Sequence, residues 1–103
     1  MIIYNVTINI QEEIHDRWLL WMNDVHIPEV MATGKFISAR LVRVHVDQEM
    51  DGLTFAAQYL AKDRATLQKY YDEDAPKMRE SGLKLWADQA LYFRTELEVL
   101  SEF

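Results

Sequence analysis

The segment from Trp18 to Gly34, WLLWMNDVHIPEVMATG, places two tryptophans, a histidine and a proline at the end of an amphipathic helical pattern. Pro28 lacks a backbone N–H and disfavours helical geometry in the residue before it, so we expect the helix to bend near Ile27. Gly34 stands where a left-handed residue commonly ends a helix. Such a bend gives His26 surroundings other than routine core packing. The segment therefore predicts a fold element and a first candidate for a functional side chain.

The helical pattern begins near Glu12, ahead of this segment. Its apolar residues fall within an arc of roughly 100°, with acidic and amide side chains outside it. These apolar residues are Ile14, Trp18, Trp21, Met22 and Val25. The pattern predicts a helix with one buried face, followed by a short continuation in which Pro28 suits the first turn and which ends at Gly34.

The opening stretch, MIIYNVTINI, alternates between apolar and polar side chains. This period of two predicts a strand with one buried face. The stretch lacks the basic region, long apolar run and small-residue cleavage site of a signal peptide. We therefore expect it to form the first strand.

Two runs rich in β-branched and aromatic residues, at 36–46 and 53–61, predict a hairpin. The pair Asp51 and Gly52 is a typical hairpin turn. Adjacent apolar residues make the register of the first run ambiguous, which favours a bulge.

A second helical region follows, with Asp63 as a good N-cap. Its inner stripe includes Leu67, Tyr70 and Tyr71. Pro76 interrupts the pattern, so we expect a second helical piece that ends near Gly82 and a short turn at 83–88. The acidic segment just before Pro76 more simply charges the positive end of that piece than binds a cation.

A last strand is predicted at 91–100, which gives the order β, α, β, β, α, β. This is the order of a ferredoxin-like α+β fold, here a single domain over 1–103. Its four-stranded antiparallel sheet carries both helices on one face. The other face needs a cover, which a second copy of the chain can supply.

Polar side chains are predicted on that uncovered face. On a face closed by a second copy such groups must pair or hold water. We predict a homodimer through sheet faces, with ion pairs between Arg94 and glutamates across it, and a wet ligand cavity is the alternative. The polar set comprises Asn5, Thr7, Asn9, Thr54, Gln58, Arg94, Glu96 and Glu98.

Composition limits the classes of function. The chain has 103 residues, 50% of them hydrophobic and 27% charged, so it is long enough for one core and too apolar for disorder. No apolar run approaches the roughly 20 residues of a membrane span. The net charge of −6 opposes nucleic-acid binding. With no cysteine, disulfides and thiolate sites are excluded, and we expect a cytoplasmic location.

Four stretches resemble a family of short bacterial proteins, known only as a domain of unknown function, with the dimeric α/β barrel fold. They are MIIYNVTINI, HDRWLLWMNDVHIPEVMATGKF, YYDEDAPKMRESGL and FRTELEVL. The resemblance covers nearly the whole chain and implies a fold, but no activity. In addition, Trp21, His26 and Pro28 resemble the W…HxP segment on the first helix of EthD-type proteins, which implies that His26 faces a cavity between sheet and helices.

His26 is the candidate catalytic residue. It is predicted at the border of the apolar stripe, near the end of the first helical piece, where the helix dipole favours an imidazolium and a freed carbonyl can accept its proton. In a pocket it can act as a general acid/base or donate to a ligand carbonyl. The more ordinary interpretation is that it caps a local carbonyl or borders the core.

A ligand site is predicted around Trp21, Met22, His26 and Tyr59. Aromatic side chains at these spacings are more commonly core residues, and we expect most of them to pack there. The aromatic set is Tyr4, Trp18, Trp21, Tyr59, Tyr70, Tyr71 and Trp86.

We predict no metal and no cofactor. His15 and His26 are separated by about 16 Å along a helix, too far to share an ion. His45 has no paired ligand at a recognisable spacing, and three glycines make a nucleotide cradle improbable.

Three functions are compatible with these features. The first is a small-molecule-binding domain with its cleft between the sheet and the bent helix. The second is a cofactor-free enzyme of monooxygenase or isomerase type that uses His26 as acid/base. The third is a protein-interaction module. Fold alone does not choose among them.

Overall fold

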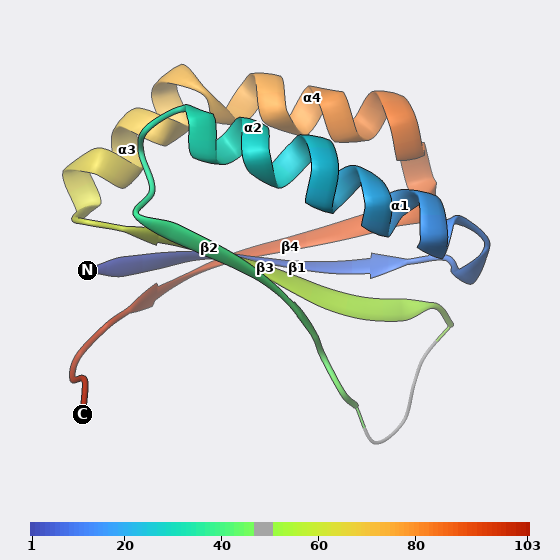
Figure 1. The fold of residues 1–103 in the computed structure, drawn as a ribbon, viewed down its shortest axis with the longest axis horizontal. Coiled ribbons are helices and arrows are strands. Elements are labelled where there is room, and N and C mark those ends of the chain that lie inside the picture. Colours follow the sequence, from blue (N-terminus) through green and yellow to red (C-terminus); the bar gives the residue numbers. More distant parts are fainter. Residues whose placement is uncertain (47–50) are drawn as a thin grey trace.

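The computed structural model describes residues 1–46 and 51–103 as a sheet covered on one face by a layer of helices (Figure 1). The strands are β1 (Ile2–Ile10), β2 (Ser38–Arg43), β3 (Leu53–Ala61) and β4 (Ala90–Glu98). The helices are α1 (His15–Trp21), α2 (Ile27–Ala32), α3 (Arg64–Glu73) and α4 (Ala75–Trp86). A π-helical turn, η2 (Met22–His26), joins α1 to α2, and 3-10 turns cover Glu12–Ile14 and Ala87–Gln89.

The four strands pair antiparallel in the order β2-β3-β1-β4. This arrangement confirms the predicted ferredoxin-like α+β fold. The strongly alternating β1 lies at the centre, where its apolar face packs under the helices and buries Ile8 and Ile10 almost completely. None of the described helices is long and apolar enough to cross a membrane.

The register of β4 corrects one prediction. Val6 of β1 faces the helices and pairs with Arg94, and Tyr4 likewise pairs with Glu96. Since paired residues lie on the same sheet face, Arg94 and the glutamates of β4 lie on the helix side. They therefore cannot form ion pairs between two copies that pack through their open sheet faces. This part of the sequence prediction was wrong.

The open face nevertheless carries the other predicted polar residues. Asn5 donates to Thr95 Oγ1 at 3.2 Å, and Asn9 donates to Thr54 Oγ1 at 3.2 Å. Between these groups lie exposed apolar side chains of β4, because the odd positions of that strand point away from the helices. They are Leu91, Phe93 and Leu97.

The bend predicted near Ile27 is instead a π turn in a continuous helix. The Ile27 N–H donates to the Met22 carbonyl, five residues back, and Ile27 keeps helical angles of φ −61° and ψ −44°. A proline inside an α-helix clashes with the carbonyl four residues back, which for Pro28 is that of Asp24, and a wider turn relieves such a clash. The extra residue in the turn also changes which side chains face the core.

Val25 is the residue most affected by this turn. A uniform period of 3.6 residues places Val25 in the apolar arc, but its side chain is 41% exposed in the structure. Met22 and Val30 are buried on either side of the turn. The prediction for Val25 was wrong because the π turn interrupts the period.

The second helical region differs from expectation at Gly82. Asp63 caps α3 as predicted, accepting from the Thr66 N–H at 2.8 Å. However, α4 continues through Gly82 to Trp86 and turns at Ala87, which has a positive φ of 49°.

Asp74 makes no side-chain cap to α4 and pairs with Lys35 at 2.9 Å instead.

The predicted hairpin is present as the β2–β3 pair. Its register runs without interruption from Ser38 opposite Leu60 to Arg43 opposite Phe55, so the predicted bulge is absent from β2. Gly52 has the expected positive φ of 93°. The rest of the turn includes 47–50, which lie outside the described residues.

Candidate functional site

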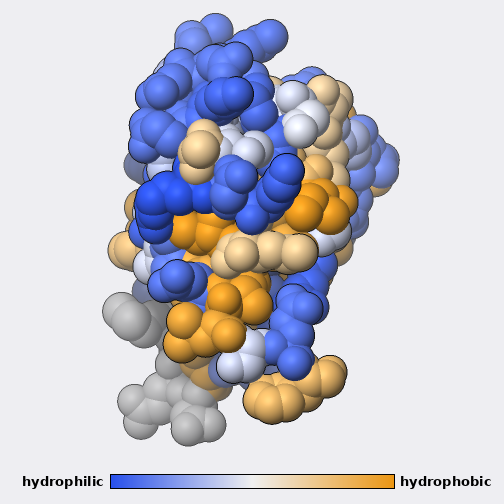
Figure 2. Space-filling view, turned by 90° about the vertical axis from the view of Figure 1, so that its left-hand side faces the viewer, coloured by the Kyte–Doolittle hydropathy of each residue, from blue (hydrophilic) through white to orange (hydrophobic). Residues whose placement is uncertain are grey.

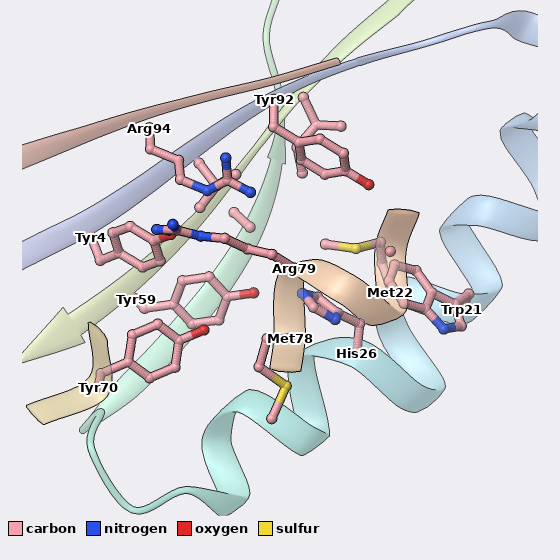
Figure 3. Close-up of a pocket in the computed structure, with 14 residues that line it drawn as sticks. Tyr4, Trp21, Met22, His26, Tyr59, Tyr70, Met78, Arg79, Tyr92 and Arg94 are labelled. Carbon is pink, nitrogen blue, oxygen red and sulfur yellow. The ribbon is translucent and has the colours of Figure 1, made fainter. Parts of the chain in front are cut away.

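A pocket lies between the helix side of the sheet and the helical layer (Figure 3). Strands β1 and β3 form its floor, β4, η2 and α4 form most of its walls, and its cavity measures about 40 Å³. Apolar side chains, among them Val6, Ile8 and Ala57, cover most of the floor. The polar groups come from tyrosines, one histidine and two arginines, so the pocket combines an apolar interior with a few polar contacts.

The four residues of the predicted ligand site all line this pocket. Trp21 and Met22 come from the end of α1 and the start of η2, His26 from the end of η2, and Tyr59 from the second half of β3. The π turn accounts for part of this grouping, because it brings His26 onto the Trp21 ring, five residues back along the chain. Whether the four residues bind a ligand stays a prediction.

The imidazole of His26 is half-buried and stacks on the Trp21 indole, with ring centroids 4.6 Å apart and planes 24° apart. Its Nδ1 is shielded from solvent and has no hydrogen-bond partner among the described residues. Burial lowers the pKa of His26, and the nearby Glu29 charge offsets this only in part. The ring is therefore neutral near pH 7. Of the two ordinary interpretations, the half-buried ring agrees with a place at the border of the core, and no hydrogen bond from Nδ1 to a described carbonyl is present.

Sequence reasoning included Tyr59 in the ligand site and favoured the core for Tyr4 and Tyr70. The rings of Tyr4, Tyr59 and Tyr70 are buried, which agrees with their assignment to the core. Their hydroxyl ends nevertheless border the pocket, and Figure 3 shows those of Tyr59 and Tyr70 directed towards the side where His26 lies. Burial raises the pKa of Tyr59 and of Tyr70, so both remain protonated hydrogen-bond donors at neutral pH.

Tyr92 forms the wall opposite Tyr59, with its ring under α4. Its hydroxyl is buried without a partner among the described residues, and burial raises its pKa. The hydroxyl would lie 3.0 Å from a Cβ built on Gly82, so the glycine leaves room for the ring. Gly82 thus allows α4 to pack closely on the Tyr92 side chain. The sequence alone does not reveal this role of the glycine.

Two arginines also border the pocket and were not predicted to do so. Arg79 extends from α4, and its Nη2 donates to the Tyr4 hydroxyl at 3.5 Å. Arg94 extends from β4, with its guanidinium carbon 5.3 Å from the centre of the Tyr92 ring. The sequence signal for Arg94 was the alternation of side chains along β4, which places Ala90, Tyr92 and Arg94 on one face.

The other histidines lie apart from the pocket. His15 contacts Asp16 through Nδ1 at 2.9 Å and stacks on Phe55, with ring centroids 5.9 Å apart. His45 is exposed after β2. Within residues 1–46 and 51–103, no group of three or more acidic or histidine side chains could hold a metal ion.

The sheet order and the helical layer on one face define a ferredoxin-like α+β protein. The chain belongs to the family of the domain of unknown function DUF4286, whose model matches residues 1–100. This membership confirms the resemblance noted in the sequence. No curated protein matches the chain in sequence.

Several solved structures share the fold. An EthD-family protein from Bacillus halodurans C-125 has a TM-score of 0.72 at 14% identity, over 97% of this chain and 100% of that one. A dimeric ferredoxin-like protein from an uncultured marine organism has a TM-score of 0.67 at 18% identity, over 99% and 97%. A candidate antibiotic biosynthesis monooxygenase from Deinococcus radiodurans has a TM-score of 0.63 at 14% identity, over 100% and 96%. At these identities the likeness establishes the fold alone.

Proposed function

We propose that this protein binds a small molecule in the pocket between its sheet and its helices. The observation that carries the proposal is the convergence of Trp21, His26 and the tyrosine hydroxyls on one largely apolar cavity. Binding sites for small molecules are commonly concave, mainly apolar and equipped with a few polar groups that set orientation.

The size of the cavity defines how a ligand enters. About 40 Å³ holds only a few water molecules, whereas pockets for larger ligands measure hundreds of Å³. The wall from α4 consists of the long, rotatable side chains of Met78 and Arg79. A ligand therefore moves the Met78 side chain outwards and is met by the mobile end of Arg79, while the sheet floor stays in place.

Methionine methyl NMR tests this proposal directly. Met22 and Met78 line the pocket, while Met31 packs against the core elsewhere and serves as an internal control. Titration with phenol and benzamide, two neutral aromatic probes, is expected to shift the Met22 and Met78 signals and to leave Met31 in place. If no probe moves the pocket methyls selectively, the binding proposal fails.

Variants of His26 separate two roles within the same proposal. A His26→Ala variant that keeps its affinity for the probes makes the histidine incidental to binding. A His26→Ala variant that loses affinity while His26→Gln retains it identifies a hydrogen bond from the side chain. The matched control is His15→Ala, which changes a histidine outside the pocket.

A second candidate function is a cofactor-free enzyme that uses His26 as acid/base. It is supported by a neutral imidazole at the pocket, since only the neutral form can accept a proton. No described side chain makes a hydrogen bond to His26, so a catalytic partner is not in place. Binding without chemistry is therefore the better-supported function.

We also propose that two copies pair through their open sheet faces. Phe93 is 59% exposed there, beside Leu91 and Leu97, and the neighbouring amides already hydrogen-bond to threonines on the same face. Figure 2 shows the end of the molecule where both termini lie. Apolar surface is visible there at the level of the sheet, below a hydrophilic helical layer. A structurally similar protein is described as dimeric, which supports this pairing.

Light scattering after size exclusion tests the dimer. The wild-type chain is expected at twice the monomer mass and Phe93→Asp at the monomer mass, with Leu83→Asp on the exposed side of α4 as control. A monomeric wild-type protein contradicts the pairing. The apolar face is then best explained by a different protein partner, the third function considered.

A further inference from the structure

Two positive side chains meet at the pocket without negative partners. Arg79 and Arg94 come from opposite walls, one from α4 and one from β4, and both border the same cavity (Figure 3). Figure 3 shows both side chains extending to the same end of the pocket, where Tyr4 lies. Neither arginine forms an ion pair with any described carboxylate. Their contacts are a hydrogen bond to Tyr4 and a cation–π contact with Tyr92.

Three basic side chains outside the pocket do pair with carboxylates. Arg64 pairs with Glu96, Lys35 with Asp74 and Lys84 with Glu80. Carboxylates are abundant, since the chain has 17 acidic residues and a net charge of −6. None of the carboxylates in the described part of the chain lines the pocket. The pocket is therefore a locally positive site on an acidic protein, and that local field favours an anion.

The remaining polar groups of the pocket also suit an anion. Tyr59 and Tyr70 keep their protons at neutral pH because burial raises the pKa of each hydroxyl. Protonated hydroxyls and guanidinium groups donate hydrogen bonds, and a carboxylate accepts them. The fork of a guanidinium matches the two oxygens of a carboxylate, and such charge-assisted pairs are the stronger ones.

The interior of the pocket is apolar and small. Beneath the arginines, Ile8, Met22 and Ala57 provide a surface without hydrogen-bond donors. An inorganic anion would leave this surface unused, and a long hydrocarbon exceeds the space. The pocket suits a ligand with a charged end and a compact apolar or aromatic body.

From this arrangement we infer that the ligand is a small organic carboxylate, with its carboxylate between Arg79 and Arg94 and its apolar body against Met22 and Tyr92. This inference rests on the proposed binding function and specifies the ligand class. The arginines are exposed side chains, so replacing them does not disturb the core.

The test compares benzoate with benzamide, a neutral molecule of the same shape, and with inorganic phosphate. The readout is the Met22 and Met78 methyl signals. Benzoate is expected to bind at least about tenfold more tightly than benzamide, and Arg79→Gln and Arg94→Gln are each expected to remove most of that preference. Arg64→Gln, an arginine outside the pocket, is the control and is expected to leave it unchanged.

The outcomes distinguish this inference from the proposed function. Equal binding of benzamide and benzoate overturns the carboxylate assignment and leaves small-molecule binding intact. Binding of phosphate as tight as that of benzoate overturns the role of the apolar body. A benzoate preference that survives in both arginine variants overturns the role of the arginines. If no probe reaches the pocket methyls, both proposals fail.

Discussion

The imidazole of His26 stacks against the indole of Trp21 inside a single helix, five residues along the chain, with ring centroids 4.6 Å apart. In a regular α-helix, side chains three or four residues apart are neighbours, and a residue five positions away points elsewhere. The π turn η2 changes that geometry because it adds a residue to the turn between them. The contact between the two rings therefore results from the π turn that precedes Pro28.

Burial of His26 makes the stability of the protein depend on pH. The pKa of His26 in the folded protein lies below the ordinary value of 6.5 because burial disfavours the charged ring. Above pH 6.5 the ring is neutral in the folded and the unfolded state, so its contribution to the unfolding free energy is complete. Below 6.5 the unfolded chain takes up the proton first, so stability falls as the pH falls towards the folded-state pKa.

Urea unfolding at a series of pH values between 8 and 5 measures how the unfolding free energy depends on pH in wild type and in His26→Gln. The loss of stability on acidification is expected to be smaller in the variant. His15→Gln, which changes a histidine outside the pocket, is the matched control. A variant with the same slope as wild type shows that His26 does not titrate abnormally.

Gly82 and Tyr92 give a second prediction. A Cβ at position 82 would lie 3.0 Å from the Tyr92 hydroxyl but 3.8 Å from the ring carbon that carries it. Alanine is favoured over glycine in a helix by about 1 kcal/mol, a gain that the clash with the hydroxyl offsets. In a Tyr92→Phe background the clash is absent. Gly82→Ala is therefore expected to stabilise the phenylalanine variant by about 1 kcal/mol and wild type by less.

A double-mutant cycle by chemical denaturation measures the difference. Tyr92→Phe alone is expected to be close to neutral, because it removes a buried hydroxyl that has no described partner. Equal effects of Gly82→Ala in both backgrounds would mean that the hydroxyl does not restrict this position.

The fold was predictable because its signals are local. The alternation in β1, the Asp63 cap and the order of elements each depend on a few neighbouring residues, and the structure confirms them. The face of β4 was less predictable. Its residues alternate without a clear apolar side, since Phe93 and Leu97 face away from the helices, and only pairing with β1 defines which face is buried.

The candidate site was predictable only in part. Trp21, Met22, His26 and Tyr59 were identified from the proline-bearing helix and from strand spacing, and the structure brings them to one pocket. Arg79 carries no local signal, and the alternation of β4 groups Arg94 with Tyr92 without showing that this face meets α4. A long-range contact of this kind cannot be deduced from periodicity.

The π turn provides a third prediction, since a uniform helix would place Val25 in the apolar arc and Val30 on the opposite side, and the structure reverses this. Val25 is 41% exposed, whereas Val30 is 1% exposed. Val25→Gln is expected to cost less than about 1 kcal/mol of unfolding free energy, and Val30→Gln more than about 3 kcal/mol, because the second buries an amide without partners. Denaturant unfolding of both variants checks this. Similar losses would place Val25 in the core and argue for a regular helix.

Glu96 gives the last prediction, as it links α3 to β4 through two partners. It accepts a hydrogen bond from the Tyr71 hydroxyl at 2.6 Å and pairs with Arg64 Nη1 at 2.9 Å. The Tyr71 hydrogen bond, followed by the Arg64 contact, lowers the pKa of Glu96 below its ordinary value of 4.5. The stabilisation is therefore complete above about pH 4.5 and is lost as the pH falls through the folded-state pKa.

Carbon-13 NMR of the Glu96 carboxyl follows that titration. Tyr71→Phe keeps the ring and removes the donor, so the pKa of Glu96 is expected to rise, and adding Arg64→Gln is expected to bring it to the ordinary value. The cost in stability is expected to stay below about 1 kcal/mol, because the group is partly exposed and solvent screens it. An unchanged Glu96 titration in Tyr71→Phe would exclude the hydrogen bond and leave Arg64 as its main partner.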